Sequence, residues 1–336
     1  MVVGIMADRR RLLLDGVGLV LLSMTVLWVF VSSLVTKSDP MQILALLSAL
    51  AVGVVAGRLL PGVVPMVVVA ITMLLFVINP LEFISRDPGG FPFGYANAKG
   101  AFLVQAAAAA LIVARTIPAG GLATAAITGA VIFGVVPLLF ESLAAGTLGL
   151  VVVAIGLAGA LLTKAYARSL GILLGMVFVV VFSTTLLIAA TETSTPAVVG
   201  DVIGDTLSER RKALWTDALS AMRDNPLVGV GPGNFENVSD IARVEDDVRW
   251  VPSAFLEQGA EGGILGLVLM FAIFLWGFVR LMASDGPGPV IAIGIAALFG
   301  IAVHVCMDYV LHYPAVPMVA GALLGSATSS AWERAR

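Results

Sequence analysis

Three cations stand together at the start of a predicted helix, where they are poorly placed for stability. Arg210, Arg211 and Lys212 follow the segment 206–209, whose spacing is that of a capping box. Free N–H groups already carry partial positive charge at a helix N-terminus, so cations there weaken the helix. Arg211 also lies one turn before Trp215, on the apolar stripe of that helix. The pattern indicates either a site for a phosphate or pyrophosphate or an anchor to lipid headgroups.

Two carboxylates, Glu257 and Glu261, lie one helical turn apart beside a long apolar run. Burial there would raise the pKa of a carboxylate toward a value that suits a general base. Alternatively, both charges only stabilise the N-terminus of the following helix. We favour Glu257 as the base, because it should lie just outside the bilayer on the same surface as Arg211.

The only two histidines of the chain, His304 and His312, stand four residues on either side of Asp308. All three would share a face if one helix continued that far. Each helical residue advances by about 100°, so three such ligands diverge over two turns. We therefore expect a polar cluster and no metal site, with Asp308 and His312 as candidates to line an active site.

Further polar residues mark the connections between apolar runs. The glycine-rich segment 229–235, with Asn234, lacks the preceding strand of a dinucleotide fold and predicts a special turn. Arg86, a further candidate to bind the lipid phosphate, lies in a loop that leads to Asn97 and Lys99. Lys99 would either meet a lipid phosphate or extend to the membrane interface.

The elements that position these residues are membrane helices. The chain of 336 residues is 59% hydrophobic and only 12% charged, which exceeds what a soluble core needs. Apolar runs of about 17–25 residues, each long enough to cross a bilayer, recur along it. We expect ten spans, near 12–35, 41–57, 62–80, 98–114, 119–140, 146–163, 169–190, 260–283, 288–307 and 313–330. No helix breaker stands out at the middle of a span.

The first span is too long for a removed signal peptide, so we expect it to be retained. Lys and Arg gather in the connections on one side of these spans, which predicts cytoplasmic N- and C-termini and an extracytoplasmic segment 191–259. Acidic residues outnumber basic ones in that segment, which argues against nucleic acid as a partner. The expected domains are a bundle of about seven spans (1–190), the loop with the phosphate site (191–259) and about three further spans (260–336). The single cysteine, Cys306, excludes an intrachain disulfide.

Several segments, in this order, resemble the O-antigen ligase and polymerase family of bacterial envelope glycosyltransferases. The resemblance rests on F-G-Y-A-N-A at 93–98, R-x-x-x-W at 211–215, D-N-P-L-V-G-V-G-P-G-N-F at 224–235, F-L-E-Q-G-A-E-G-G-I-L-G at 255–266 and M-D-Y-V-L-H-Y-P at 307–314. It implies an all-α, polytopic bundle of the GT-C kind, in the bacterial cytoplasmic membrane, whose long external loop contains an amphipathic helix.

The resemblance also implies the reaction and its partners. A glycan would pass from a polyprenyl-linked phosphate or pyrophosphate to an acceptor hydroxyl on the outer face of the membrane, without a metal or other cofactor. The acceptor would be a glycan, a lipid or a protein. Arg211 would bind the phosphate with Arg210 beside it. Ser208, Trp215, Asn97, Asn234, Ser253 and Asp308 would support the site.

One position departs from the family. Its members generally carry a histidine, regarded as the base or activator, just before the segment that matches 254–256, and here Pro252 and Ser253 stand there. The proton must then go to Glu257, Glu261 or His312, or the chain is a non-catalytic member that binds lipid-linked glycan or a partner enzyme. A glycan polymerase is the nearest alternative, whereas a transporter is disfavoured because the spans contain few charges.

Overall fold

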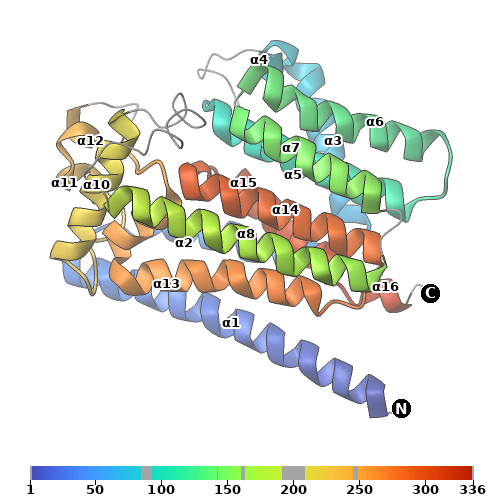
Figure 1. Cartoon of the computed structure of the whole chain (residues 1–336), viewed down its shortest axis with the longest axis horizontal. Coiled ribbons are helices and arrows are strands. Elements are labelled where there is room, and N and C mark those ends of the chain that lie inside the picture. Colours follow the sequence, from blue (N-terminus) through green and yellow to red (C-terminus); the bar gives the residue numbers. More distant parts are fainter. Residues whose placement is uncertain are drawn as a thin grey trace.

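The described chain is built from helices (Figure 1). The computed structural model describes residues 2–84, 93–141, 143–159, 163–190, 209–244 and 249–334, and none of these residues lies in a strand. Ten apolar helices coincide with the ten predicted spans: α1 (Val2–Thr36), α2 (Met41–Leu59), α3 (Val63–Ile78), α5 (Ala96–Thr116), α6 (Gly121–Val136), α7 (Leu143–Ala158), α8 (Lys164–Ala190), α13 (Ala254–Met282), α14 (Gly288–Met307) and α15 (Ala315–Ala327).

The prediction of a polytopic helical bundle is confirmed. Seven of the described helices are long and apolar enough to cross a membrane, and α3, α7 and α15 are shorter apolar helices. The remaining elements are α4 (Pro80–Ile84), the π-helix η1 (Pro137–Glu141), α10 (Glu209–Asp224), α11 (Phe235–Val238), α12 (Asp240–Val244), the 3-10 helix η4 (Val310–His312) and α16 (Ala331–Arg334). Figure 1 shows α10, α11 and α12 gathered at one end of the long axis, with both chain termini toward the other end.

Small residues let the central helices approach closely. The alanines of segment 106–110 in α5 are fully buried. Between α2 and α15, Gly53 and Gly57 face Gly321 and Gly325 so closely that a Cβ on any of them would strike the backbone of the other helix. Two G-x-x-x-G motifs thus form this contact, as expected where packing and not hydrophobic burial drives helix association.

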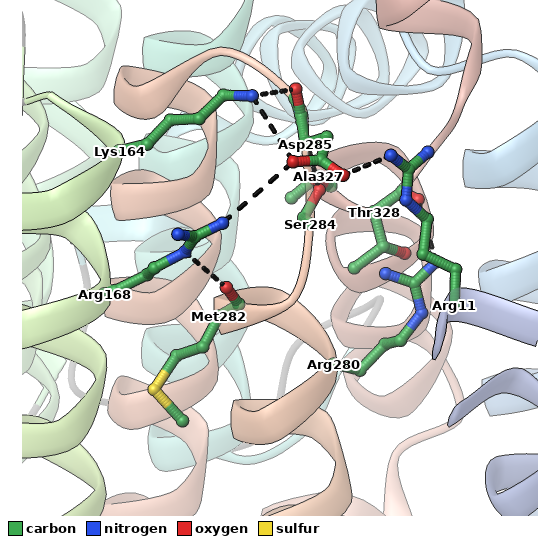
Figure 2. A network of polar contacts seen from close by, with 10 residues as sticks. Arg11, Lys164, Arg168, Arg280, Met282, Ser284, Asp285, Ala327 and Thr328 are labelled. Carbon is green, nitrogen blue, oxygen red and sulfur yellow. Dashed lines mark hydrogen bonds and ion pairs between the residues drawn. The ribbon is translucent and has the colours of Figure 1, made fainter. Parts of the chain in front are cut away.

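The end of the bundle near the termini is held by ion pairs around Asp285, in the connection between α13 and α14 (Figure 2). Asp285 pairs with Arg11 of α1, and it lies 3.6 Å from Lys164 and 4.0 Å from Arg168, both of α8. Arg280 donates to Thr328 O at 3.3 Å. These contacts tie α1, α8, α13 and the segment after α15 together.

Three local expectations need correction. The helix expected from residue 260 begins at Ala254, and the helix that carries His304 ends at Met307, before Asp308. The α13 helix is also broken at Gly263, whose φ of 67° no interior helical residue adopts, although the sequence shows no obvious breaker there. The predicted capping box at 206–209, with Ser208, lies outside the described residues except for Glu209, where α10 begins.

Candidate active site

The N-terminus of α13 buries the two carboxylates. Ser253 is the N-cap, and its Oγ accepts a hydrogen bond from the backbone N–H of Leu256. The helix therefore begins early enough to place Glu257 in its first turn and Glu261 in its second. Both side chains are buried, with Glu257 only 2% exposed and Glu261 4% exposed.

A histidine contacts the first of these carboxylates. His312, in η4, has its Nε2 at 2.7 Å from Glu257 Oε2. Its other ring nitrogen, Nδ1, lies 2.8 Å from Nε2 of Gln42, in the first turn of α2. Both nitrogens of His312 are thus engaged, whereas Glu257 Oε1 is buried and has no hydrogen-bond partner among the described residues. In the hydrogen-bonded series Gln42–His312–Glu257, Oε1 of Glu257 is therefore the atom that can still take a proton.

The carboxylate also controls the charge of His312. Burial alone would lower the pKa of the imidazole, but the neighbouring Glu257 carboxylate outweighs it, and the pKa of His312 is raised above its usual value. Trp250 stacks on the His312 ring with centroids 4.8 Å apart. The ring therefore sits between a carboxylate, an amide and an indole, which fix its orientation.

Asp308 is the centre of a second polar cluster, at the start of the same loop. Tyr95 donates its hydroxyl to the two carboxylate oxygens at 2.9 and 3.0 Å, and the Asn97 amide donates to Oδ2. Asp308 is 2% exposed, and its backbone oxygen accepts from Ala254 N at 3.2 Å. This one residue thus joins the start of α5 to the start of α13.

Arg211 reaches the same cluster from α10. Its Nη1 donates to Met307 O at 3.1 Å, and its Nη2 lies 4.0 Å from Asp308 Oδ2. Its side chain remains 25% exposed. Trp215, one turn later, is buried and donates from Nε1 to Pro252 O at 2.9 Å. The helix with the cations is therefore fastened to the segment that leads into α13.

The glycine-rich segment 229–235 completes the break in α13. Gly229, Gly231 and Gly233 all have positive φ, between 67° and 97°. Val230 N donates to Ala260 O, and Gly231 N to Glu261 O, both at 2.9 Å. These bonds satisfy carbonyl groups that the broken helix leaves without a helical partner. The prediction of a special structural turn is confirmed.

An elongated cavity begins at the carboxylates. It contains about 1150 Å³ of empty space, part of it open to the surface, between α1, α2, α13, α14 and α15. Glu257, Gln258, Glu261 and His312 line one end. Leu50, Phe274, Leu298 and Leu324 are among the mostly apolar residues that line the remainder.

The family model for O-antigen ligase matches residues 129–271, from α6 to the middle of α13. This span belongs to the O-antigen ligase family. No curated protein matches the chain. The ligase-family span contains Arg211, Trp215, Pro252 and both carboxylates, whereas His312 and Asp308 reach it from outside the match.

The structure brings most of the predicted site residues close together. Arg211, Trp215, Asn97, Ser253 and Asp308 join one cluster through the contacts above, and Glu257, Glu261 and His312 line the cavity. Asn234 lies in the glycine turn and donates to Val230 O.

Other predicted residues lie apart. Arg210 is exposed on α10. Lys99 is 1% exposed inside the bundle, so it neither extends to the interface nor presents its charge to a surface. His304 is buried in α14 and shares no helical face with the residues that follow Met307. Arg86 and Ser208 lie outside the described residues.

Three contributors were not anticipated as site residues. Gln42 and Trp250 hold His312, and Tyr95 binds Asp308. Tyr95 stands inside the segment 93–98 that carries the family resemblance, so its position could have been suspected. Gln42 opens an ordinary apolar run, and nothing in its local sequence signals the contact.

Proposed function

We propose that this protein is an envelope glycan ligase. It transfers a glycan from a polyprenyl phosphate or pyrophosphate to an acceptor hydroxyl at the outer face of the bacterial cytoplasmic membrane. The acceptor oxygen forms a bond to the anomeric carbon of the glycan while the bond from that carbon to the phosphate oxygen breaks. The acceptor proton passes to the protein, and the polyprenyl phosphate or pyrophosphate leaves.

The observation that carries this proposal is the unpartnered Oε1 of Glu257 at the polar end of the cavity. A buried carboxylate oxygen without a donor is costly unless a substrate supplies one. An acceptor hydroxyl would donate to Oε1 and then lose its proton to it. His312 holds Oε2 and so acts as a positioning residue that keeps Oε1 directed toward the acceptor. Glu261, whose Oε1 accepts from Phe235 N at 3.4 Å, is the less suitable base.

Arg211 supports the leaving group in this scheme. A guanidinium that is partly exposed at a helix N-terminus can grip phosphate oxygens in two places. Its bond to Met307 O and its proximity to Asp308 hold the side chain beside the loop that carries His312. Arg210, exposed next to it, would add charge for the leaving pyrophosphate.

The direct test uses purified protein in lipid nanodiscs with extracted polyprenyl-linked glycans and an acceptor mixture from the same envelope. We expect free polyprenyl phosphate or pyrophosphate to appear together with glycosylated acceptor. Products in which one lipid-linked glycan is extended by another would assign the polymerase reaction instead.

Pro252 favours one alternative, because the family it resembles generally carries a histidine at that place. In a non-catalytic member the chain would bind lipid-linked glycan without transferring it. Retained binding of the donor, without turnover on any acceptor, would support that alternative and contradict the ligase.

We further propose that both termini are cytoplasmic and that 191–259 is extracytoplasmic. Cys306 is fully buried, so an introduced cysteine can be labelled selectively. Asn237→Cys, exposed in α11, should react with an impermeant thiol reagent in whole cells. Ala119→Cys, exposed between α5 and α6, should react only after permeabilisation. The opposite pattern would reverse the orientation.

A further inference from the structure

The start of α2 lies beside the loop that precedes α15. The backbone of residues 318–322 packs against Gly53, and that of residues 322–326 packs against Gly57, so α2 and α15 run side by side in the same direction. The first turn of α2 therefore meets the loop before α15. There Nε2 of Gln42 comes within 2.8 Å of Nδ1 of the histidine in that loop.

The two ring nitrogens of His312 have partners of different kinds. Glu257 lies at Nε2, and as an ionised carboxylate, the form in which it can act as a base, it only accepts hydrogen bonds. The neutral ring then carries its proton on Nε2 and leaves Nδ1 without one. Gln42 lies at Nδ1 and offers both donors and an acceptor. Its amide donates to Nδ1 of the neutral ring and, turned over, accepts from Nδ1–H of the imidazolium.

The charged groups that act on the His312 ring are carboxylates. They are Glu257 and Glu261 of α13 and Asp308 of the same loop, and each favours the imidazolium over the neutral ring. A further carboxylate at Nδ1 would add to this effect, because a ring between two carboxylates bonds to both only when it is protonated. The neutral amide of Gln42 avoids that bias.

Other titratable groups surround the loop. Arg211 lies beside Asp308, and Arg249 lies over the ring of Trp250, which in turn stacks on His312. The elements packed around the loop also carry Tyr95, Lys99, His304, Tyr309 and Tyr313. Among the described residues, no charged group forms an ion pair with Nδ1 of the ring. A charge introduced in place of Gln42 is therefore the most direct way to alter the ring from this side.

We infer that Gln42 is a positioning residue, which holds the His312 ring in its neutral and its protonated form and adds no charge of its own. The inference rests on the proposed ligase function with Glu257 as the base. During transfer Glu257 takes the acceptor proton and loses its charge, so the bond at Nε2 of the ring weakens. The bond from Gln42 at Nδ1 then keeps the ring in place until Glu257 is ionised again.

The test changes the charge at position 42 without changing the length of the side chain. Gln42 is exposed, so its substitution opens no buried cavity. In Gln42→Glu, the pH midpoint of turnover should rise by about one unit or more, because the second carboxylate stabilises the imidazolium. At a pH well below the parent's midpoint, this shift lowers turnover by about tenfold or more. Ser220→Glu, which adds the same charge at an exposed position of α10, is the matched control and should keep the parent's midpoint.

Gln42→Met separates positioning from charge. Methionine has a similar length, but it cannot donate a hydrogen bond and accepts only weakly. We expect kcat to fall by about two- to tenfold at every pH, with the midpoint and both KM values unchanged, because the ring loses its hold and no charge is added. A purely structural role would lower turnover alike in Gln42→Glu and Gln42→Met and leave the midpoint in place, and this result would overturn the inference.

The nitrogen resonances of the imidazole give a readout that needs no turnover. Protein with isotope-labelled histidine, in lipid nanodiscs, contains only two imidazoles, and His312→Asn identifies which signals belong to residue 312. Above its titration midpoint, the parent ring should have a protonated Nε2 and an unprotonated Nδ1. In Gln42→Glu the ring should titrate about one pH unit higher or more.

The opposite tautomer in the parent, or equal titration midpoints in the parent and in Gln42→Glu, would overturn the inference. Parent-like kcat in Gln42→Met would also overturn it. If the parent transfers nothing, the ligase proposal fails, and the ring titration then tests the hold at Nδ1 by itself. A higher midpoint in Gln42→Glu would support that hold, whereas an unchanged one would exclude it.

Discussion

Glu257→Gln should abolish turnover while leaving the fold and the donor site intact. Glutamine has almost the same shape and can still bond to His312 Nε2, but it cannot take a proton. The loss of a general base typically costs a factor of about 10²–10⁴ in rate, which is roughly 2.7–5.4 kcal/mol of transition-state stabilisation. Donor binding should persist, because Arg211 approaches from α10 and does not contact Glu257.

The pH dependence of the parent gives a second readout. Below the raised pKa of His312 the ring is an imidazolium that holds the Glu257 carboxylate in an ion pair. Above that pKa the ring is neutral, and the carboxylate can take the acceptor proton without giving up an ion pair. Turnover should therefore rise with pH through a midpoint above the usual histidine value of about 6.5.

In Glu257→Gln the main cause of the raised pKa is gone while burial of the ring remains, so the pKa of His312 should fall. Stacking on Trp250 makes the indole fluorescence a reporter of this titration, because an imidazolium quenches it. Comparison of Trp250→Phe with the parent identifies how much of the fluorescence signal comes from Trp250.

The rate assay follows polyprenyl phosphate release under single-turnover conditions, so that product release does not mask the chemical step. Glu236→Gln is the matched control, since this half-exposed carboxylate lies 3.7 Å from Arg249 and away from the cavity. Parent-like turnover in Glu257→Gln would refute the role of Glu257 and transfer it to Glu261. An unchanged His312 titration in that variant would refute the pairing itself.

Three further outcomes are expected. Arg211→Ala should weaken the binding of a polyprenyl pyrophosphate by about tenfold to a hundredfold, and Arg211→Lys should restore that affinity only in part, because a point charge cannot bind a phosphate in two places. Parent-like affinity in both variants would exclude the phosphate role. Gly231→Ala should destabilise the protein by roughly 1–3 kcal/mol in thermal unfolding, because the φ of residue 231 is 97° and a Cβ there would strike Thr36. Gly62→Ala serves as the control, since a Cβ at residue 62 would enter open space. Asp285→Ala should lower the unfolding free energy by roughly 1–2 kcal/mol, since three cations then lose a shared, largely shielded partner. The control Asp240→Ala, whose side chain is 94% exposed in its ion pair with Arg243, should unfold as the parent does.

The membrane helices could be predicted from the sequence because a bilayer leaves few alternatives. Backbone groups in lipid must be bonded within the segment, so an apolar run of sufficient length becomes a helix whatever surrounds it. The boundaries were harder, because Glu257, Gln258 and Glu261 lower the local hydropathy and shift the apparent start of α13 past Ser253. The cap at Ser253 was the available signal.

The break at Gly263 could not be read from the sequence, because its cause is a contact. Pro226 O accepts from Ile264 N at 2.9 Å, and a Cβ on Gly263 would strike the backbone of Leu227. Glycine inside an apolar run is common in membrane helices, so the residue alone does not predict a break. The contact of Gln42 with His312 spans 270 positions and leaves no local trace.

Pro252 changes the route by which a histidine reaches the base. Its carbonyl oxygen still accepts the Trp215 bond, and any side chain at this position leaves that oxygen in place, so the link between α10 and α13 does not require a histidine there. The imidazole comes instead from loop 308–312, whose start is fixed by Asp308 through Tyr95 and Asn97. The position of the proposed base thereby depends on residues of α2, of the start of α5 and of the loop 308–312, all of which lie outside the ligase-family span. A Pro252→His substitution would add a second imidazole without removing the bond between His312 and Glu257, so it should not increase turnover.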